Sequence, residues 1–185
     1  MIYFTADPHW GHFNIIRYTN RPFESAPQMD AELIKRWNSK VTKSDTVYLL
    51  GDVFFGKEEY FDKIISQLNF EHLHVIKGNH DKPFARWYES RKPRNVSFYG
   101  SYLETRLNGR DFTLCHYALR VWNKSHHNAL HLYGHSHGTL PDDPHNKSMD
   151  VGVDTNSYYP YSFDEVVKNL DGKKIKPLDH HGSLE

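Results

Sequence analysis

Cysteine is nearly absent from this chain, because Cys115 is the only one among 185 residues. A single cysteine excludes an intramolecular disulfide and is compatible with a reducing compartment. The lack of further thiolates also argues against a structural zinc site. We interpret Cys115 as a small buried hydrophobe, since nothing around it in the sequence indicates a nucleophile.

Net charge and long apolar runs are missing as well. The 23 basic and 23 acidic residues cancel, so overall charge does not favour binding to nucleic acid or anionic membranes. No apolar stretch approaches the ~20 residues that span a bilayer. The first six residues are too short for a signal peptide. We therefore expect a soluble cytoplasmic protein that uses neither a membrane nor nucleic acid as its main partner.

One domain accounts for a chain of this length. Aromatic residues make up 15% of the chain and supply much of the expected core. We expect the domain to occupy residues 1–178. Residues 179–185 contain His180-His181 and could be vector-derived, so we set them apart as a tail.

Strands alternate with helices in the first half of the chain. Residues 1–6, 46–50 and 72–76 are apolar and β-prone, whereas residues 27–40 and 57–68 have apolar residues at helical spacing. This order favours an α/β fold with parallel strands. In such sheets, ligands bind beyond the carboxyl ends of the strands.

The second half of the chain has a different pattern. Short strands are indicated at 96–99, 102–107, 110–114, 130–133 and 149–153, a short helix at 164–170, and long loops at 19–27 and 138–148. Asn108-Gly109 between two of these strands is a strong hairpin signal. We interpret this half as antiparallel sheet.

Polar clusters follow five of the predicted strands. They are Asp7-Pro8-His9, Gly51-Asp52, Gly78-Asn79-His80-Asp81, Cys115-His116 and Gly134-His135-Ser136-His137. They offer carboxylate, imidazole and amide ligands in sufficient number for two metal ions, and two-metal sites mostly catalyse phosphoester chemistry. This mixture of ligands suits Mn²⁺, Fe²⁺ or Zn²⁺.

The spacing of two clusters indicates how they would hold a metal. Asp7 and His9 are two residues apart, so in an extended segment both side chains reach one ion. His135 and His137 either do the same or diverge, one to each ion of a pair. The alternative for each cluster is an ordinary turn with unrelated polar side chains.

The Gly51-Asp52 and Gly78–Asp81 clusters offer a bridging carboxylate, a neutral ligand and a proton donor. The two oxygens of Asp52 can bridge two cations, and the Asn79 amide is a neutral, hard ligand. His80 can donate a proton to a leaving oxygen, and Asp81 can orient or charge-stabilise that imidazole. The competing interpretation is a helix cap or a β-turn.

The five clusters, in this order, resemble the calcineurin-like metallophosphoesterase family over roughly residues 1–155. Residues 9–16 further resemble a small bacterial and phage subgroup. The resemblance implies a four-layer α/β sandwich, in which two mixed sheets pack face to face with helices outside. It implies a first metal held by Asp7, His9 and His137, a bridge by Asp52, and a second metal held by Asn79, His116 and His135. It also implies that His80 stabilises the transition state and protonates the leaving group.

One motif departs from the family pattern, and several residues near the motifs are candidate substrate contacts. The second block continues Val53-Phe54-Phe55 where the family often has another Asp or Asn, which indicates either an apolar wall beside the site or ordinary core. His12 is a candidate to contact substrate phosphate or to brace a metal ligand, and the alternative is an exposed loop histidine. Arg17, Arg21 and Arg120 are candidate phosphate contacts, and the alternative for each is a solvated surface arginine. The candidate stacking residues are Trp10, Tyr117 and Trp122.

We therefore predict a hydrolase of small phosphoesters, nucleotides among them, with two divalent metal ions. Mn²⁺ is the first choice, with Fe, Zn or Ni as alternatives. A phosphodiesterase is favoured over a monoesterase, with metal-activated hydroxide as the nucleophile and His80 as the general acid. The alternatives are a nucleotide pyrophosphatase or cyclic-nucleotide hydrolase, a nuclease, and a non-catalytic metal-binding interaction module.

Overall fold

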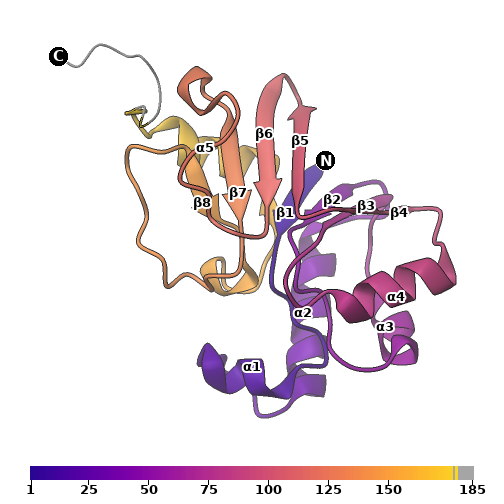
Figure 1. Ribbon diagram of the computed structural model, residues 1–185. Coiled ribbons are helices and arrows are strands. Elements are labelled where there is room, and N and C mark those ends of the chain that lie inside the picture. Colours follow the sequence, from indigo (N-terminus) through magenta and orange to yellow (C-terminus); the bar gives the residue numbers. More distant parts are fainter. Residues whose placement is uncertain (177, 179–185) are drawn as a thin grey trace.

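Two mixed β-sheets form the centre of the structure, a computed structural model that describes residues 1–176 and 178 (Figure 1). The first sheet consists of β1 (Ile2–Thr5), β2 (Thr46–Leu49), β3 (His72–Ile76), β4 (Val96–Tyr99) and β9 (Tyr161–Ser162). The second consists of β5 (Tyr102–Leu107), β6 (Arg110–Cys115), β7 (Leu130–Tyr133) and β8 (Ser148–Asp150). Residues 179–185, the expected tail, lie outside the described residues.

Strand order brings the early polar motifs to one edge of the first sheet. The order is β4-β3-β2-β1-β9, in which β1 to β4 are parallel and β9 is antiparallel. The carboxyl ends of parallel strands lie at the same edge of a sheet. Since β1, β2 and β3 end shortly before Asp7, Asp52 and Asn79, these three side chains begin close together.

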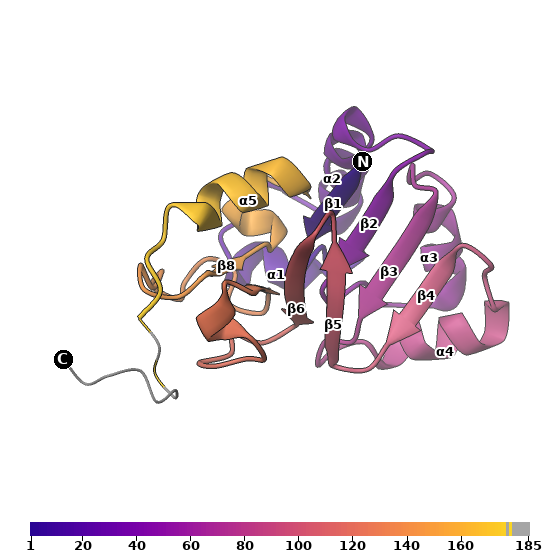
Figure 2. The ribbon, with the colours of Figure 1, turned by 90° about the horizontal axis from the view of Figure 1, so that it is seen from above.

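Three helices cover the outer face of the first sheet (Figures 1 and 2). They are α2 (Ala26–Lys40), α3 (Glu58–Ile65) and α4 (Lys82–Arg91). Their apolar sides, which include Leu33, Trp37 and Phe61, form one hydrophobic core with the strands. At the start of α2, the Ser25 side chain accepts a hydrogen bond from the Gln28 amide, a cap that fixes where the helix begins.

A second core lies between the two sheets. Phe4 of β1 stacks on Phe112 of β6 with ring centroids 5.3 Å apart, and Leu132 of β7 is fully buried beside them. The last helix, α5 (Phe163–Asp171), adds Val166 to this core. The expected α/β sandwich of two mixed sheets packed face to face is confirmed.

The sequence had indicated that the second half of the chain forms an antiparallel sheet, and this expectation was wrong for most of the second sheet. Its order is β5-β6-β7-β8, and only the β5–β6 pair is antiparallel. That pair is the predicted hairpin, in which Asn108 and Gly109 have φ values of 45° and 80°. Long connections precede β7 and β8, and they return the chain to the same end of the sheet, as parallel pairing requires.

Two α-helices and one strand were not predicted from the sequence. The helix α1 (Phe13–Tyr18) has only six residues and no side-chain cap. The helix α4 begins directly after the Gly78–Asp81 cluster, and its start signal, Pro83 in the first turn, was overlooked beside that motif. The strand β9 has two residues, too few for any periodicity. Among the described helices, none has the length and apolar character that crossing a membrane requires.

Candidate metal centre

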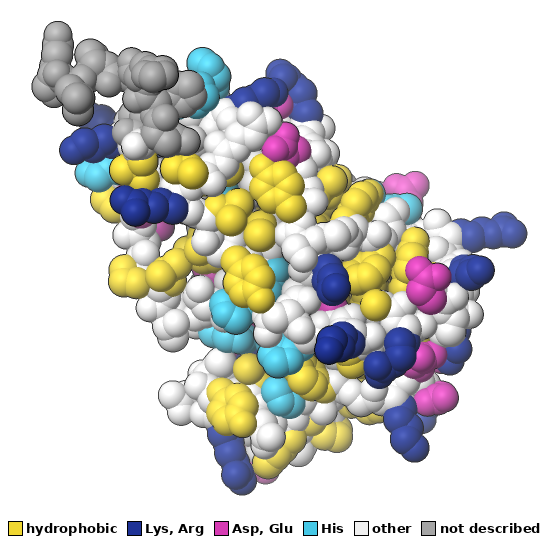
Figure 3. All heavy atoms as spheres, in the orientation of Figure 1, with side chains coloured by type: hydrophobic (Ala, Val, Ile, Leu, Met, Phe, Trp, Pro, Cys, Tyr) yellow, Lys and Arg dark blue, Asp and Glu magenta, His cyan; other side chains and the backbone are white. Residues whose placement is uncertain are grey.

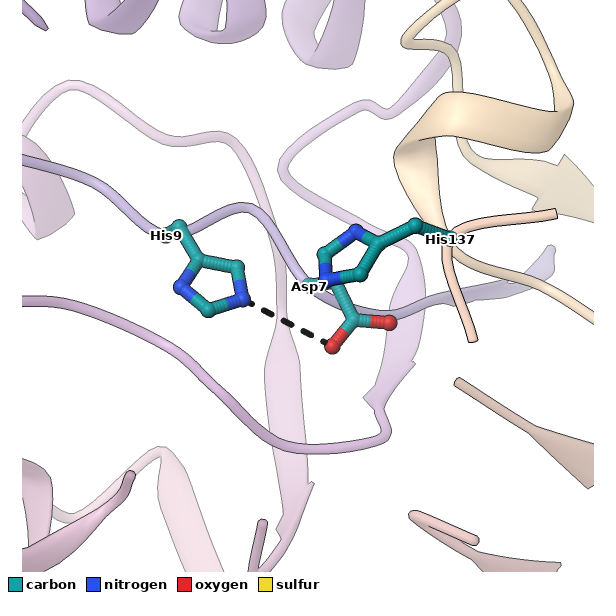
Figure 4. A group of neighbouring side chains, drawn as sticks. All are labelled: Asp7, His9 and His137. Atoms are coloured by element: carbon teal, nitrogen blue, oxygen red, sulfur yellow. Dashed lines mark ion pairs between the residues drawn. The ribbon is translucent and has the colours of Figure 1, made fainter. Parts of the chain in front are cut away.

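Two groups of side chains that could hold metal ions meet where the two sheets end. Asp7, His9 and His137 form the first group (Figure 4), and Asp52, His116 and His135 form the second. Within each group the ligand atoms all lie within 4.8 Å of one another. His135 and His137 therefore diverge, one to each group, which is the second of the two arrangements that their spacing allowed.

The backbone of these residues is left-handed rather than extended. Asp7, His9, Asp52, His135 and His137 have φ values of 57°, 51°, 55°, 65° and 48°. The expectation of an extended Asp7-x-His9 segment was therefore wrong. Asp and His tolerate this conformation better than most residues, yet each instance costs roughly 1 kcal/mol or more. Backbone strain at five residues that lie close together in space is typical of a functional site.

Asp7 is completely buried, and only one of its two oxygens has a hydrogen bond. Its Oδ2 accepts a hydrogen bond of 2.8 Å from the His135 amide, whereas Oδ1 has no hydrogen-bond partner. Burial raises the pKa of this carboxyl to about 7, against the charges of His116 and His137. Asp7 thus presents a buried, unsatisfied oxygen to the first group.

His9 presents a second unsatisfied atom at the same place. Its Nε2 has no hydrogen-bond partner and lies 3.9 Å from Asp7 Oδ1 (Figure 4) and 3.6 Å from Asp52 Oδ2. Its Nδ1 lies 3.3 Å from Nδ1 of His12. Burial lowers the pKa of His9 to about 2, so the ring is neutral, which is the form that binds metals.

Asp52 belongs to the second group and also faces the first. Its Oδ1 accepts a hydrogen bond of 2.9 Å from the His80 amide. Its Oδ2 lies 3.6 Å from His9 Nε2 and 3.5 Å from His116 Nε2, so it faces both groups. Burial alone would raise the pKa of Asp52, but the hydrogen bond and charge of His116 hold it down at about 2.

His116 is oriented by the backbone of β2's end. Its Nδ1 lies 2.7 Å from the Leu50 carbonyl oxygen, and its Nε2 lies 2.9 Å from Asn79 Oδ1. Burial by itself would lower the pKa of His116, whereas Asp52 and Asp7 raise it to about 9. The Asn79 amide oxygen therefore lies next to the second group, whose other members are a carboxylate and two imidazoles.

His137 is oriented by Asp154, a residue that the sequence analysis missed. Oδ2 of Asp154 lies 2.7 Å from His137 Nδ1, and Asp154 also forms a two-pronged ion pair with Arg21. The signal was available, because Asp154 follows the predicted strand at 149–153.

Arg21 was a candidate phosphate contact, and that expectation was wrong. Its guanidinium is buried and donates to both oxygens of Asp154 and to the Asp7 and Pro8 carbonyl oxygens. All of these partners belong to the loops of the site. Arg21 therefore ties the Asp7 loop to the Asp154 loop and has no exposed face for a substrate.

Asp81 also occupies a different place from the one expected beside the His80 imidazole. Its two oxygens accept hydrogen bonds from the backbone amides of Asp52, Val53 and Gly78, at 2.7 to 2.9 Å. The carboxylate is fully buried, and burial raises its pKa. Asp81 thus fastens the loop after β2 to the loop after β3.

A cavity of about 690 Å³ opens beside the two groups. It is lined by His9, His12, Ile15, Tyr18, Thr19, Asp52, Phe55, His80, His135, Ser136, His137 and Thr139. Figure 3 shows histidine side chains gathered on this face, with hydrophobic side chains next to them. His80 is exposed to the cavity. Phe55 forms the apolar wall that the sequence suggested, whereas Phe54 is ordinary core and stacks on Phe61.

Of the other candidate substrate contacts, some lie at the cavity and others do not. His12 lines the cavity and braces His9, while the exposed Arg17 and Arg120 are not among its lining residues. Trp10 and Trp122 are buried and unavailable for stacking. Tyr117 is exposed and touches the His135 ring at a centroid distance of 4.8 Å.

Comparison with known proteins agrees with this geometry. Residues 5–149 match the family model of the calcineurin-like phosphoesterase superfamily domain. The "Uncharacterized protein MJ1445" of Methanocaldococcus jannaschii is 32% identical over 186 residues, 96% of each chain. The Gene 66 protein of Mycobacterium phage L5 is 34% identical over 83 residues, which are 44% of this chain and 40% of that protein.

A solved structure shares the fold. The protein of unknown function AQ665 from Aquifex aeolicus superposes with a TM-score of 0.68 at 23% identity, over 91% of this chain and 98% of the other. The family match, which spans most of the chain, supports phosphoester hydrolysis with divalent metal ions as the general activity. The chain belongs to the calcineurin-like phosphoesterase superfamily.

Proposed function

We propose that this protein is a phosphodiesterase with two divalent metal ions. The single observation that carries the proposal is the position of Asp52 Oδ2, which faces His9 of one ligand group and His116 of the other at 3.6 and 3.5 Å. One carboxylate oxygen between two sets of ligands is the arrangement that a metal pair needs for a bridge.

The buried polar atoms at the first group support a resident cation. Among the described residues, Asp7 Oδ1 and His9 Nε2 are buried without a hydrogen-bond partner. An unsatisfied buried polar atom is costly, by about 1 to 3 kcal/mol. A cation held by these two atoms and by His137 would satisfy both of them.

The second group fits a cation through a different feature. His116 Nε2 lies within 3.5 Å of both Asn79 Oδ1 and Asp52 Oδ2, and its raised pKa places a proton there at neutral pH. A cation bound by these atoms and His135 would take the place of that proton. The donors are nitrogen and oxygen atoms without sulfur, which suits Mn²⁺ first and Fe²⁺, Zn²⁺ or Ni²⁺ after it.

His80 is the proposed general acid. When bound, two divalent ions would supply charge for the phosphate oxygens and an activated water for attack on phosphorus. The His80 amide is bound to Asp52 Oδ1, so the residue is fixed at the site while its side chain is exposed to the cavity. From there the imidazole can give a proton to the leaving alkoxide.

The charge of the cavity favours a diester over a monoester. Within the described part of the chain, no Lys or Arg lines the cavity, and Arg21 is occupied by Asp154. A phosphodiester carries one negative charge, whereas a monoester at neutral pH carries nearly two and gains more from additional cationic groups. The same absence disfavours a nuclease, which needs a positive track along the strand.

Hydrolysis of a generic aryl phosphodiester tests the proposal. We expect the protein loaded with Mn²⁺ to hydrolyse bis(p-nitrophenyl) phosphate faster than p-nitrophenyl phosphate. A folded, metal-loaded protein that turns over neither ester with Mn²⁺, Fe²⁺, Ni²⁺ or Zn²⁺ would leave the non-catalytic binding module as the better account.

A further inference from the structure

Three rings form a continuous aromatic wall on one side of the cavity. His12 stacks on Phe55 with centroids 3.9 Å apart and an interplanar angle of 17°, and Tyr18 meets His12 edge-on at 6.4 Å. All three residues line the cavity. We name them the aromatic strip. Tyr18 is 73% exposed, so its ring is accessible to a ligand that enters the cavity.

The strip is held in place by its surroundings. Gly11 has a φ of +78°, and a Cβ there would lie 2.5 Å from the Phe55 carbonyl oxygen, so only glycine lets the two segments pack this closely. The Gly11 amide donates to the buried carboxylate of Asp30, at 3.1 and 3.0 Å. On the other side, buried Ile15 anchors α1, which carries Tyr18. These contacts hold in place the backbone segments that carry the strip.

The inner end of the strip reaches the reacting groups. The Phe55 ring lies 5.1 Å from the His80 ring and 5.3 Å from the His9 ring, measured between centroids. A group bound along the strip would thus be attached to a phosphate at the metal centre. The cavity of about 690 Å³ is in the range that takes a small organic ligand and far exceeds what phosphate alone needs.

Charge limits the kind of ligand that fits. The described lining residues include no Lys or Arg. Additional phosphate groups would therefore find no cationic partner beside the metals. A planar ring, in contrast, would find three aromatic surfaces.

We propose that the aromatic strip of Tyr18, His12 and Phe55 is a subsite for an aromatic ring carried by a singly charged phosphodiester. A phenyl ring or a nucleobase meets this description, whereas polyphosphates and dialkyl phosphodiesters do not. This inference rests on the proposed phosphodiesterase function, and it narrows the substrate class of that same site.

Titration calorimetry of the full chain with Mn²⁺ tests the subsite by binding. Diphenyl phosphate and diethyl phosphate carry the same single charge and differ in their rings. We expect diphenyl phosphate to bind at least about tenfold more tightly. Tyr18→Ala and Phe55→Leu should each weaken diphenyl phosphate by roughly 2- to 10-fold and leave diethyl phosphate unchanged.

The matched control is Phe13→Ala. Phe13 is an exposed aromatic residue of the same helix, but it is not among the lining residues of the cavity. It should leave both affinities unchanged. Four outcomes would each overturn the subsite. Two concern the original protein, which would bind the two diesters equally or bind neither. The other two concern the variants: Tyr18→Ala would weaken both diesters equally, or Phe13→Ala would have an effect as large as that of Tyr18→Ala.

A parallel assay separates this proposal from the one on which it rests. Turnover of bis(p-nitrophenyl) phosphate without discrimination between diphenyl and diethyl phosphate would reject the subsite and keep the function. Discrimination that depends on Tyr18, in a protein with no turnover of any diester, would keep the subsite and reject the function.

Discussion

Asp154 and His137 are joined by a contact of 2.7 Å between a carboxylate oxygen and Nδ1. With Nδ1 engaged, the other ring nitrogen of His137 is left for the ligand group that it shares with Asp7 and His9. Burial alone would lower the pKa of His137, but the contact with Asp154 and the charges of Asp7 and Asp154 raise it. Replacing a residue that orients a metal-binding histidine in this way typically lowers metal affinity by about 10- to 100-fold.

Asp154→Asn should therefore weaken metal binding without removing a ligand. We expect the affinity of the first site to fall by about 10- to 100-fold, because the imidazole loses its orienting charge. Competition titration against a chelator measures this. Asp164→Asn, a change at an exposed residue of α5, is the control and should keep the original affinity. Unchanged affinity in Asp154→Asn would remove its positioning role.

Asp52→Asn should reduce metal occupancy more severely. The substitution removes the negative charge that faces both ligand groups at 3.6 and 3.5 Å. We expect the purified variant to hold fewer than two Mn²⁺ per chain by elemental analysis and to lose nearly all hydrolysis. Full occupancy with the original rate would show that Asp52 is not the bridge.

His80→Ala should separate catalysis from metal binding. The imidazole is the proposed acid and is not a ligand, so Mn²⁺ content should stay as in the original protein. The rate of diester hydrolysis should fall by roughly 10²- to 10⁴-fold, the usual contribution of a general acid. A leaving group of low pKa needs less help from an acid, so the loss should be smaller for bis(p-nitrophenyl) phosphate than for an alkyl phosphodiester. A variant with undiminished rates on both esters would exclude the role.

Asp30 should make stability depend on pH. Burial raises its pKa from 3.8 to about 6, against its hydrogen bonds from Tyr60 and Gly11. The folded state therefore favours the protonated form. The contribution of protonated Asp30 to the free energy of unfolding is fully present well below pH 4 and is lost as the pH rises through 6. The shift of about two units corresponds to about 3 kcal/mol.

Urea unfolding of the original protein and of Asp30→Asn between pH 4 and 7.5 measures this effect. The other titrating groups are common to both proteins, so their contributions cancel in the difference. The stability of the original protein relative to Asp30→Asn should fall by about 2 kcal/mol across this range, because part of the full effect lies below pH 4. A difference that stays constant with pH would contradict the shift.

Gly78→Ala should disturb the site through packing alone. An added Cβ would lie 2.4 Å from Asp52 Oδ1 and 2.6 Å from the Asp52 amide, so the Asp52 loop must move. We expect a loss of roughly 1 to 3 kcal/mol in unfolding free energy, together with weaker metal binding. Gly100→Ala is the control, because nothing lies within 4 Å of its added Cβ. Equal melting temperatures for both variants would contradict this account.

Much of the fold was readable from the sequence because local signals agreed with the tertiary structure. The apolar runs before Asp7, Asp52 and Asn79 are strands, and the parallel arrangement inferred from their alternation with helices places all three residues at one edge. The signal for the hairpin, Asn108-Gly109, was equally local. The parallel pairing of β7 and β8 was not readable, because it depends on long connections whose course no short pattern encodes.

The sequence indicated which polar residues the structure brings together, but not the geometry in which they lie. The spacing of His135 and His137 could not decide which group each would join, because their left-handed backbone depends on contacts made elsewhere, such as the bond from the His135 amide to Asp7. The roles of Asp81, Arg21 and Asp154 depend on loops that are distant in sequence. Their charges are visible in the chain, but their partners are not.

A titration of the metal-free protein with Mn²⁺, followed by the initial rate of bis(p-nitrophenyl) phosphate hydrolysis, tests the central claim most directly. We expect the rate to rise until two equivalents of Mn²⁺ per chain have been added and then to remain constant. Saturation at one equivalent, or no turnover by a folded protein that has bound two, would contradict a two-metal phosphodiesterase.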